Sequence, residues 1–417
     1  MRKALFATAG AVLLVVAGLI AFALYRKQQS HDVRGSSTQE FVTTQQEEPK
    51  PVNPGGKIRW PMYRFDAARL GTAERMLVEP PYKPLWFFRA HSLVEFPPAV
   101  AYGRLYFANA VGVLFAVDTT KVKARWTYNA HRCTAASPAV DGHSVYMSFL
   151  NAPPCNATRG GLDGQVVAFN ADTGKVRWRL KIGPTESSPL VVNGVVYVGD
   201  WNGKIYAISA ATGATRWTFQ TGDKVKGALA YAGGRVFAGS YDHHVYALNA
   251  STGKLFWRAS AQQRLGPRGR FYSTPAVAYG RVYIGSTDGK VYSFGATSGK
   301  LRWSHGTGGY VYASPAIWQE RVYAGSYNGT FYCFDAATGD VRWTYKANGP
   351  ISGSPVVIND VVYFSSLKGR TYGLDPRTGK LLWSFRRGAY AAVVTDRRRL
   401  YLVGRARIFG LAPRLRG

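Results

Sequence analysis

The chain has 417 residues, 14% of them aromatic, and its 53 Lys and Arg against 23 Asp and Glu give a net charge of +30. So basic a protein either has anionic neighbours, such as lipid headgroups, cell-wall polymers or an acidic protein face, or carries a well-solvated surface. The sequence contains no nucleic-acid reader motif and its first segment indicates export, which together exclude a nucleic-acid partner. Its three cysteines include no Cys-Cys pair and no Cys-x-x-Cys-His haem site.

The chain begins with an apolar segment. Ala4–Tyr25 contains 22 uncharged residues, which as a helix would span about 33 Å, enough for the hydrocarbon core of a bilayer. Arg2 and Lys3 precede it and favour a cytoplasmic N-terminus. The Ala21-Phe22-Ala23 pattern could be a cleavage site, which would make the protein secreted. Because a polar region before that pattern is nearly absent, residues 1–27 are interpreted as an uncleaved anchor, with a signal sequence as the alternative. Both place the rest of the chain outside the cytoplasm.

Two short segments follow the anchor. Residues 28–57 hold five Gln, three Glu and three Pro with few apolar side chains, so they are predicted to form a flexible polar linker. Residues 58–81 are expected to pack as an irregular cap on the domain formed by residues 82–417.

Residues 82–417 carry a tryptophan at a nearly constant interval. Successive gaps are 40, 52, 39, 40, 46, 40 and 40 residues, and a period near 40 indicates one repeated supersecondary unit. Eight tryptophans share this spacing and are interpreted as docking residues that pack neighbouring repeats together: Trp86, Trp126, Trp178, Trp217, Trp257, Trp303, Trp343 and Trp383.

Each repeat is predicted to form four short antiparallel strands. The apolar runs are four to six residues long and rich in Val, Tyr, Phe and Ile, which is too short for helices. Asn202-Gly203 and Asp288-Gly289 are two-residue hairpin signals. A Thr-Gly turn before most of the tryptophans supplies a second turn. Since one such sheet cannot bury both faces alone, we expect an all-β, eight-bladed β-propeller of four-stranded antiparallel blades.

The count of strands predicts how the ring closes. The last repeat supplies three strands, near residues 390–411, and lacks the strand that would carry a tryptophan. Trp86 has no such strands before it. An N-terminal strand around Trp86 is therefore expected to complete the eighth blade and hold the two ends of the propeller together.

The repeat resembles a known family. The spacing Ala-x-x-x-x-Thr-Gly-Lys-x-x-Trp at residues 168–178 and 247–257 is similar to the tryptophan-docking repeat of pyrroloquinoline-quinone (PQQ) propellers. That resemblance covers about residues 58–413 and implies one of two functions. Quinoprotein dehydrogenases hold PQQ with calcium and use an Asp base, whereas BamB-type outer-membrane assembly scaffolds bind no quinone. Fold alone does not decide between them.

The cysteines fall in different environments. Cys133 and Cys155 lie in two loops expected on the same face of the second blade, and in an oxidising compartment they are predicted to form a disulfide. Cys333 lies in a strand where a sister repeat has Ala207, so it is expected to be a buried free thiol.

The candidate binding site lies where the repeats differ. Each repeat has an aromatic residue in its second strand. The residue eleven positions before this aromatic changes from repeat to repeat, and it is expected at the end of the channel where loops from all blades converge. Such a position can recognise a specific ligand, although loop drift would give the same variation. The candidate ligand- or partner-binding residues there are Glu95, Glu186, Lys226, Tyr272, Tyr312 and Tyr390, joined by Arg268 and Arg270 from an insertion in the fifth repeat.

The pattern favours a non-catalytic scaffold in the cell envelope that binds an envelope protein or an acidic polymer through a basic, aromatic face, without a cofactor. The alternative is a PQQ-binding dehydrogenase or sensor, in which a cationic, aromatic funnel would hold the three carboxylates of PQQ beside calcium. No acidic cluster suited to calcium can be placed, because Glu95 and Glu186 come from nonadjacent repeats. No catalytic or metal-binding residue is therefore assigned.

Overall fold

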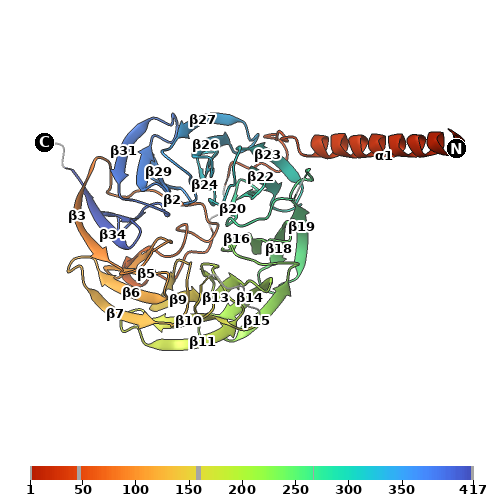
Figure 1. Ribbon diagram of the computed structural model, residues 1–417. Helices are drawn as coiled ribbons and strands as arrows, with labels where there is room; N and C mark the ends of the chain where they lie inside the picture. The colour runs from red at the N-terminus through yellow and green to blue at the C-terminus, as the bar shows by residue number, and fades with distance from the viewer. Residues whose placement is uncertain (1, 45–47, 156–160, 266, 415–417) are drawn as a thin grey trace.

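The computed structural model describes residues 2–44, 48–155, 161–265 and 267–414. Within these ranges the chain forms one α-helix, α1 (Arg2–Gln29), and eight sheets, each built on four antiparallel strands and arranged radially around a central channel (Figure 1). The prediction of an all-β, eight-bladed β-propeller preceded by an apolar helix is confirmed.

The blades follow one another along the chain, and each runs from the channel outward. Blades 1 to 4 comprise β4 (Ala99–Ala101), β5 (Arg104–Ala108), β6 (Val113–Asp118) and β7 (Ala124–Asn129); β8 (Ala139–Asp141), β9 (Ser144–Phe149), β10 (Gly164–Asn170) and β11 (Val176–Ile182); β12 (Leu190–Val192), β13 (Val195–Gly199), β14 (Lys204–Ser209) and β15 (Thr215–Gln220); and β16 (Ala230–Ala232), β17 (Arg235–Gly239), β18 (His244–Asn249) and β19 (Leu255–Ser260).

The other four blades repeat this order. Blades 5 to 8 comprise β20 (Ala276–Ala278), β21 (Arg281–Gly285), β22 (Lys290–Gly295) and β23 (Leu301–Gly306); β24 (Ala316–Trp318), β25 (Arg321–Gly325), β26 (Thr330–Asp335) and β27 (Val341–Lys346); β28 (Val356–Ile358), β29 (Val361–Ser366), β30 (Arg370–Leu374) and β31 (Leu381–Arg386); and β32 (Val394–Thr395), β33 (Leu400–Val403), β34 (Arg407–Pro413) and β3 (Tyr82–Arg89).

The burial of each strand follows from its place in the blade. β13, with the sequence Val-Val-Tyr-Val-Gly, is buried at every residue, because neighbouring blades cover both of its faces. The outermost strand of the same blade, β15, alternates exposed and partly buried residues. The continuous apolar runs in the sequence are therefore inner strands, and the mixed runs that carry the tryptophans form the rim.

The ring closes through its first strand, as predicted. β3 pairs antiparallel with β34, with Trp86 opposite Gly410 and Phe88 opposite Ile408. Strands from the two ends of the chain thus lie side by side in blade 8, where Figure 1 shows orange β3 beside blue β34.

The tryptophans join one blade to the next. In six blades the indole Nε1 donates a hydrogen bond to a carbonyl of the following blade, over 2.8 to 3.1 Å. The ring also packs on the Gly of the following Thr-Gly turn: a Cβ added to Gly339 would lie 2.6 Å from Cδ2 of Trp303. Trp383 instead meets Tyr82 of β3 edge-on, at 5.1 Å between ring centroids. The turn glycines thus provide both a positive φ and the space for an indole.

Residues 58–81 close one end of the channel. β1 (Ile58–Trp60) pairs with β4, and β2 (Thr72–Ala73) runs parallel to β28. Between them the cap accepts hydrogen bonds from innermost strands through the carbonyls of Pro61, Ala67, Ala68, Leu70 and Gly71. The cap therefore satisfies backbone donors along the channel that would otherwise be unpaired.

Residues 30–44, expected to belong to a flexible linker, lie against the propeller. Val33 exchanges two backbone hydrogen bonds with Ser304 of β23, and Glu40 forms an ion pair with Arg302. The buried Arg281 donates to the carbonyls of Ser36, Gln39 and Glu40. These contacts use the main chain and single charges, so a low apolar content did not reveal them. A short 3₁₀ turn, η1 (Pro54–Gly56), precedes the cap.

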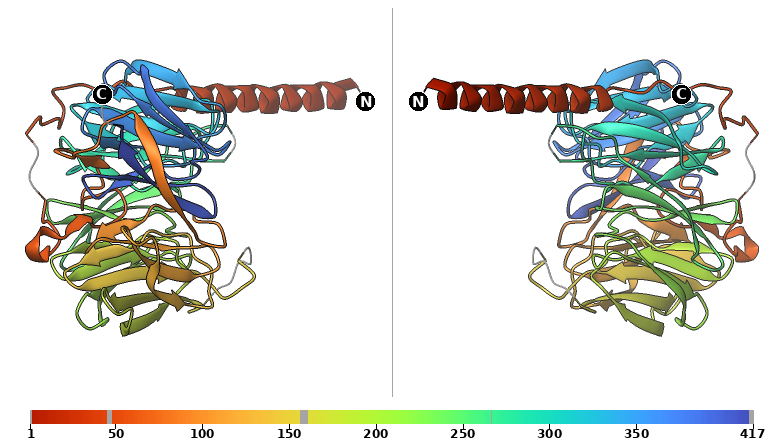
Figure 2. Two further views of the ribbon diagram at one scale, coloured as in Figure 1. Left: turned by 90° about the vertical axis from the view of Figure 1, so that its left-hand side faces the viewer. Right: turned by 90° about the vertical axis from the view of Figure 1, so that its right-hand side faces the viewer.

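Most of the described side chains of helix α1 are exposed, and the helix extends away from the ring. Among the described residues it contains one candidate membrane span, Val12–Gln29, by length and mean hydropathy. The two side views place α1 on the side of the ring opposite the cap-side turn near residue 55 (Figure 2).

Candidate binding site at the open end of the channel

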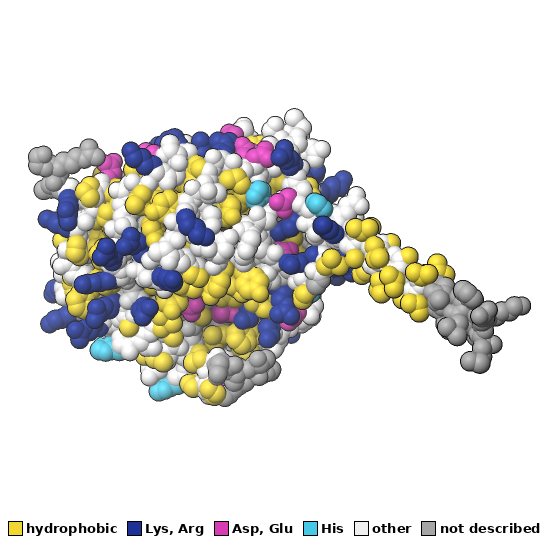
Figure 3. Space-filling model, turned by 45° about the horizontal axis from the view of Figure 1, so that its top comes forward, with side chains coloured by type: hydrophobic (Ala, Val, Ile, Leu, Met, Phe, Trp, Pro, Cys, Tyr) yellow, Lys and Arg dark blue, Asp and Glu magenta, His cyan; other side chains and the backbone are white. Residues whose placement is uncertain are grey.

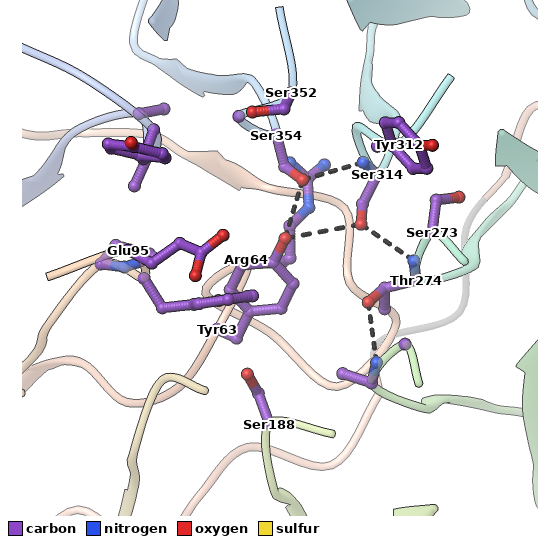
Figure 4. Close-up of a pocket in the computed structure, with 18 of the residues that line it drawn as sticks. Tyr63, Arg64, Glu95, Ser188, Ser273, Thr274, Tyr312, Ser314, Ser352 and Ser354 are labelled. Carbon is purple, nitrogen blue, oxygen red and sulfur yellow. Dashed lines mark hydrogen bonds between the residues drawn. The ribbon is translucent and has the colours of Figure 1, made fainter. Parts of the chain in front are cut away.

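The end of the channel opposite the cap, here called the channel mouth, contains a cavity of about 470 Å³. Its floor is formed by the cap residues Trp60, Tyr63 and Arg64. The Tyr63 hydroxyl lies 2.7 Å from Oγ of Ser354, which fixes the ring across the channel (Figure 4). The cavity thus has a floor built by one segment and walls built by the loops that precede the innermost strands and by turns between second and third strands.

The structure places six of the predicted site residues around this cavity. They come from blades 1, 3, 4, 5, 6 and 8 and are Glu95, Glu186, Lys226, Tyr272, Tyr312 and Tyr390. The residues share one wall because each precedes an innermost strand by a similar number of residues. Arg268 and Arg270 do not line the cavity; Arg270 lies at its rim, with Cζ 5.4 Å from the ring centre of Tyr241.

Glu186 and Lys226 form a paired charge in the wall. Lys226 Nζ lies 2.9 Å from Glu186 Oε1, and the side chains are 18% and 8% exposed. Trp201 Nε1 donates to the same oxygen over 3.0 Å, and the Tyr272 hydroxyl donates to the other over 3.3 Å. Lys226 Nζ also lies 4.3 Å from the ring centre of Trp201, 5.4 Å from that of Tyr241 and 5.7 Å from that of Tyr272. An ammonium group therefore sits between a carboxylate and three aromatic rings.

Glu95 lies in the same cavity without such a partner. Among residues 2–44, 48–155, 161–265 and 267–414, none forms a hydrogen bond or ion pair with its carboxylate within 4.0 Å. The Glu95 side chain as a whole is exposed to solvent in the cavity. The nearby protein still removes part of the water around its carboxylate, and this desolvation, followed by the charge of Glu186, raises the pKa of Glu95 above its ordinary value.

Tyrosines form one side of the cavity. The ring centroids of Tyr272 and Tyr312 are 5.4 Å apart, and Tyr312 lies 5.6 Å from both Tyr310 and Tyr327. The Glu186 charge, then burial, raises the pKa of Tyr272 well above its ordinary value, so its hydroxyl stays protonated and can donate. The aromatic character predicted for this face is present in the cavity wall.

Some residues of the site were missed by sequence reasoning. Trp201, Tyr241 and Tyr327 occupy the position four residues after the second-strand aromatic, in the turn between the second and third strands of their blades. Other repeats have Thr287 or Leu367 there, so this position also varies. A search for every position at which the repeats disagree would have found it.

Basic side chains surround the mouth rather than fill it. The cavity wall holds two cations, Lys226 and Arg64, and both are engaged: Lys226 with Glu186, and Arg64 with the carbonyls of Pro315 and Pro355. Lys224, Arg264, Arg268 and Arg270 lie in loops of blades 4 and 5 outside the cavity wall. On the face shown in Figure 3, Lys and Arg outnumber Asp and Glu and gather at the left-hand edge. The basic side chains that border the mouth in blades 4 and 5, here called the basic rim, thus lie outside an inner wall whose charges are nearly balanced.

Two further features lie near the site. Cys133 and Cys155 form a disulfide, with a Cα–Cα distance of 5.5 Å, which joins two mouth-side loops of blade 2. Cys333 is buried opposite Trp343 in blade 6. Among the described residues, no group of three or more His, Cys, Asp or Glu side chains could hold a metal ion.

The fold and this cavity define a PQQ-like repeat propeller with an open channel mouth. A family model described as outer membrane protein assembly factor BamB matches residues 76–187, 162–330 and 306–415, and the chain belongs to this family of PQQ-like β-propeller repeat proteins.

Known proteins of both functional kinds are similar to the chain. Quinoprotein alcohol dehydrogenase PedH from Pseudomonas putida is 28% identical over 131 residues, which is 28% of this chain and 21% of that relative's length. The chain therefore spans about a fifth of the curated relative it matches. The structure of BamB from Moraxella catarrhalis is similar over 80% of this chain and all of that one, with a TM-score of 0.63 and 19% identity. A europium-containing methanol dehydrogenase is similar over 85% of this chain and 98% of that one, with a TM-score of 0.72 and 14% identity. These structural likenesses show the fold alone.

Proposed function

We propose that the protein is a non-catalytic scaffold outside the cytoplasm, tethered by α1, which binds an envelope protein or an acidic polymer at its channel mouth. The observation that carries this proposal is the cavity: the cap closes one end of the channel, and six residues at a non-repeating position line the other end. A site whose residues differ from blade to blade, on blades that otherwise repeat, suits recognition of one specific partner.

The position of α1 supports a role near a membrane surface. Gln262 Nε2 donates to the Gln29 carbonyl over 3.3 Å, and Lys290 Nζ donates to the Ser30 carbonyl over 2.6 Å. Gln262 lies in the mouth-side loop before β20, so the helix leaves the ring at the mouth side of blade 5. With α1 in a bilayer, the basic rim lies near the lipid surface, where it favours anionic partners.

PQQ binding is the second candidate, favoured by the similarity to PedH. The cavity wall does not fit this cofactor. PQQ carries three carboxylates, whereas Arg64 and Lys226 are already engaged and the carboxylates of Glu95 and Glu186 would face the ligand. Among the described residues, no side-chain cluster would hold the accompanying calcium ion. No catalytic step through PQQ is derived for this chain.

Two measurements on the full-length protein in a nonionic detergent test the proposal. Titration with PQQ and Ca²⁺ is followed by Trp and Tyr fluorescence, and dye reduction is assayed with alcohols and sugars. We expect neither saturable binding nor turnover. Saturable PQQ binding accompanied by dye reduction would contradict the proposed scaffold function and indicate an enzyme.

Site-specific photo-crosslinking in cells tests the binding face. A photoreactive residue at Tyr310, at the mouth, is compared with one at Gln319, in the turn between β24 and β25 on the cap side. We expect a discrete adduct from position 310 and none from position 319. Equal adducts from both positions, or an adduct from 319 alone, would contradict binding through the channel mouth.

A further inference from the structure

Among the described residues that line the cavity, Glu95 is the one whose charged side chain has no partner. We infer that the cavity binds an organic cation, a protonated amine or a guanidinium group, which pairs with Glu95 among the aromatic residues of the wall. This inference rests on the proposed function with an envelope protein, not an acidic polymer, as the partner, and it specifies the chemistry of the group that this protein presents inside the cavity.

The other charges of the cavity are already compensated. Glu186 accepts from Lys226, Trp201 and Tyr272. The fully buried Arg64 donates to the backbone carbonyls of Pro315 and Pro355 and remains charged at neutral pH, since burial lowers its pKa only to about 10. No cation is therefore available to Glu95 from the described part of the chain, and a ligand that brings one would neutralise a partly desolvated carboxylate.

The walls around Glu95 suit a cation better than an anion. Phe96, the next residue, packs 5.8 Å from Tyr63 between ring centroids, and Tyr312 and Tyr390 add further aromatic surface to the same cavity. Aromatic faces attract ammonium and guanidinium groups. An anionic group in this cavity would instead meet Glu95 and Glu186.

The protein already contains an example of this recognition. Lys226 places its own ammonium against the rings of Trp201 and Tyr241 and against the Glu186 carboxylate. The cavity that contains Glu95 offers the same kinds of group, a carboxylate and aromatic side chains, without the ammonium. The cavity, at about 470 Å³, has room for an alkylamine or for the side chain of a Lys or Arg.

Three five-carbon probes separate charge from shape. Cadaverine, 1,5-pentanediol and glutarate have similar lengths and carry positive, neutral and negative ends. Each is titrated calorimetrically into the full-length protein in nonionic detergent. We expect cadaverine to bind and the other two not to bind. Binding of glutarate, or equal binding of pentanediol, would overturn the inference.

A second arm identifies the source of the cation. The tripeptide Gly-Lys-Gly is compared with the same peptide acetylated on the Lys side chain. Preference for the free lysine over its acetylated form and over cadaverine identifies a partner's side chain as the source. Preference for cadaverine over both peptides identifies a small free amine. Failure of cadaverine and of both peptides to bind overturns the inference.

Variants assign the contact to Glu95. Glu95→Gln removes the charge at constant shape and is expected to weaken cadaverine binding at least about tenfold, since a charge-assisted hydrogen bond contributes about 1.5–3 kcal/mol. Glu95→Asp, which keeps the charge, should retain part of the affinity. The matched control, Glu320→Gln, changes an exposed carboxylate on the cap side and should leave affinity unchanged.

Three outcomes of these titrations would refute the assignment of the contact to Glu95. The first is an unchanged cadaverine affinity in a Glu95→Gln variant whose thermal midpoint is also unchanged, and the second is an equal loss of cadaverine affinity in Glu320→Gln. The third is competition between cadaverine and Ca²⁺ at stoichiometric concentration, which would identify a metal site. If neither cadaverine nor either peptide binds while the crosslink from position 310 persists, the inference is wrong and the proposed scaffold function is retained. Turnover with PQQ would instead contradict the proposed scaffold function.

Discussion

The contact between Trp303 and Gly339 provides a test of the interaction that holds the ring together. Trp303 is completely buried, and its Nε1 donates to the Ala336 carbonyl of blade 6 over 2.9 Å. Trp303→Ala is expected to destabilise the propeller by about 3–5 kcal/mol through loss of packing. The Ala336 carbonyl stays satisfied, because the Tyr283 hydroxyl also donates to it over 3.0 Å. The expected loss therefore comes from packing, with about 1 kcal/mol from the hydrogen bond.

Gly339→Ala perturbs the same contact from the other side. Gly339 has a φ of +78°, and an added Cβ would lie 2.6 Å from Cδ2 of Trp303. Left-handed backbone costs a residue with a side chain about 1–2 kcal/mol, and overpacking adds about 1–3 kcal/mol. Gly194→Ala is the matched control: its φ is +72° and an added Cβ meets no atom within 4 Å, so only the backbone term of about 1–2 kcal/mol remains.

The double variant Trp303→Ala/Gly339→Ala separates the cost of the left-handed backbone at residue 339 from the cost of overpacking against the indole. Without the indole, the added methyl group has space, so the double variant should be less destabilised than the sum of the single variants by about 1–3 kcal/mol. Urea denaturation followed by circular dichroism measures each free energy of unfolding, provided the m value is unchanged. Additivity within about 0.5 kcal/mol, or equal effects of Gly339→Ala and Gly194→Ala, would refute docking of the indole on this turn.

Four other predictions test separate features. Deletion of residues 82–90 removes β3 from blade 8 and should strongly lower the thermal midpoint in scanning calorimetry; an unchanged midpoint would contradict closure by this strand. Replacement of Cys133 and Cys155 by Ser should destabilise the protein by about 3 kcal/mol, given a loop of 22 residues, and peptide mass spectrometry without reductant should show the pair linked. The basic rim should bind anionic vesicles in sedimentation at low salt and release them at high ionic strength, whereas salt-independent binding would exclude an electrostatic contact. Since desolvation in the cavity and the charge of Glu186 raise the pKa of Glu95, cadaverine affinity should be full well above that pKa and fall as pH decreases through it; an affinity that rises on acidification would contradict a role for the Glu95 carboxylate. The other titratable or charged groups of the cavity wall are Glu186, Lys226, Arg64, Tyr63, Tyr241, Tyr272, Tyr312, Tyr327 and Tyr390.

Most of the fold could be predicted because the same sequence pattern recurs in eight repeats. The interval between tryptophans, the Thr-Gly turns and the short apolar runs each give the same strand order, so an error in one repeat is corrected by the others. The missing strand of the last repeat and the surplus strand at Trp86 likewise predict the closure seen between β3 and β34. These features depend on local turns and on periodic packing, both of which leave a pattern in the sequence.

The contacts of the N-terminal segment leave no such pattern. The ion pair of Glu40 with Arg302 and the bonds of Arg281 to carbonyls join residues more than 240 positions apart. Each of these contacts occurs once, so the repeat pattern of the sequence cannot predict it. The polar composition of the same residues predicts disorder instead. The Glu186–Lys226 pair is an intermediate case: both residues were found as variable positions, but their mutual contact depends on the spacing of blades 3 and 4.

The variation at the channel mouth follows from how the blades pack. Trp303 and Gly339 must match each other, so a change at either one affects the interface between two blades. Glu95 and Lys226 instead precede their innermost strands and face the channel, where a substitution leaves the stacking of β-sheets intact. A propeller can therefore change the chemistry of its mouth one blade at a time while its core repeat is retained. Among the described residues, the Glu95 carboxylate has no partner, whereas Lys226 and Glu186 form a pair, and this is the kind of single-blade difference that the architecture permits without any change in fold.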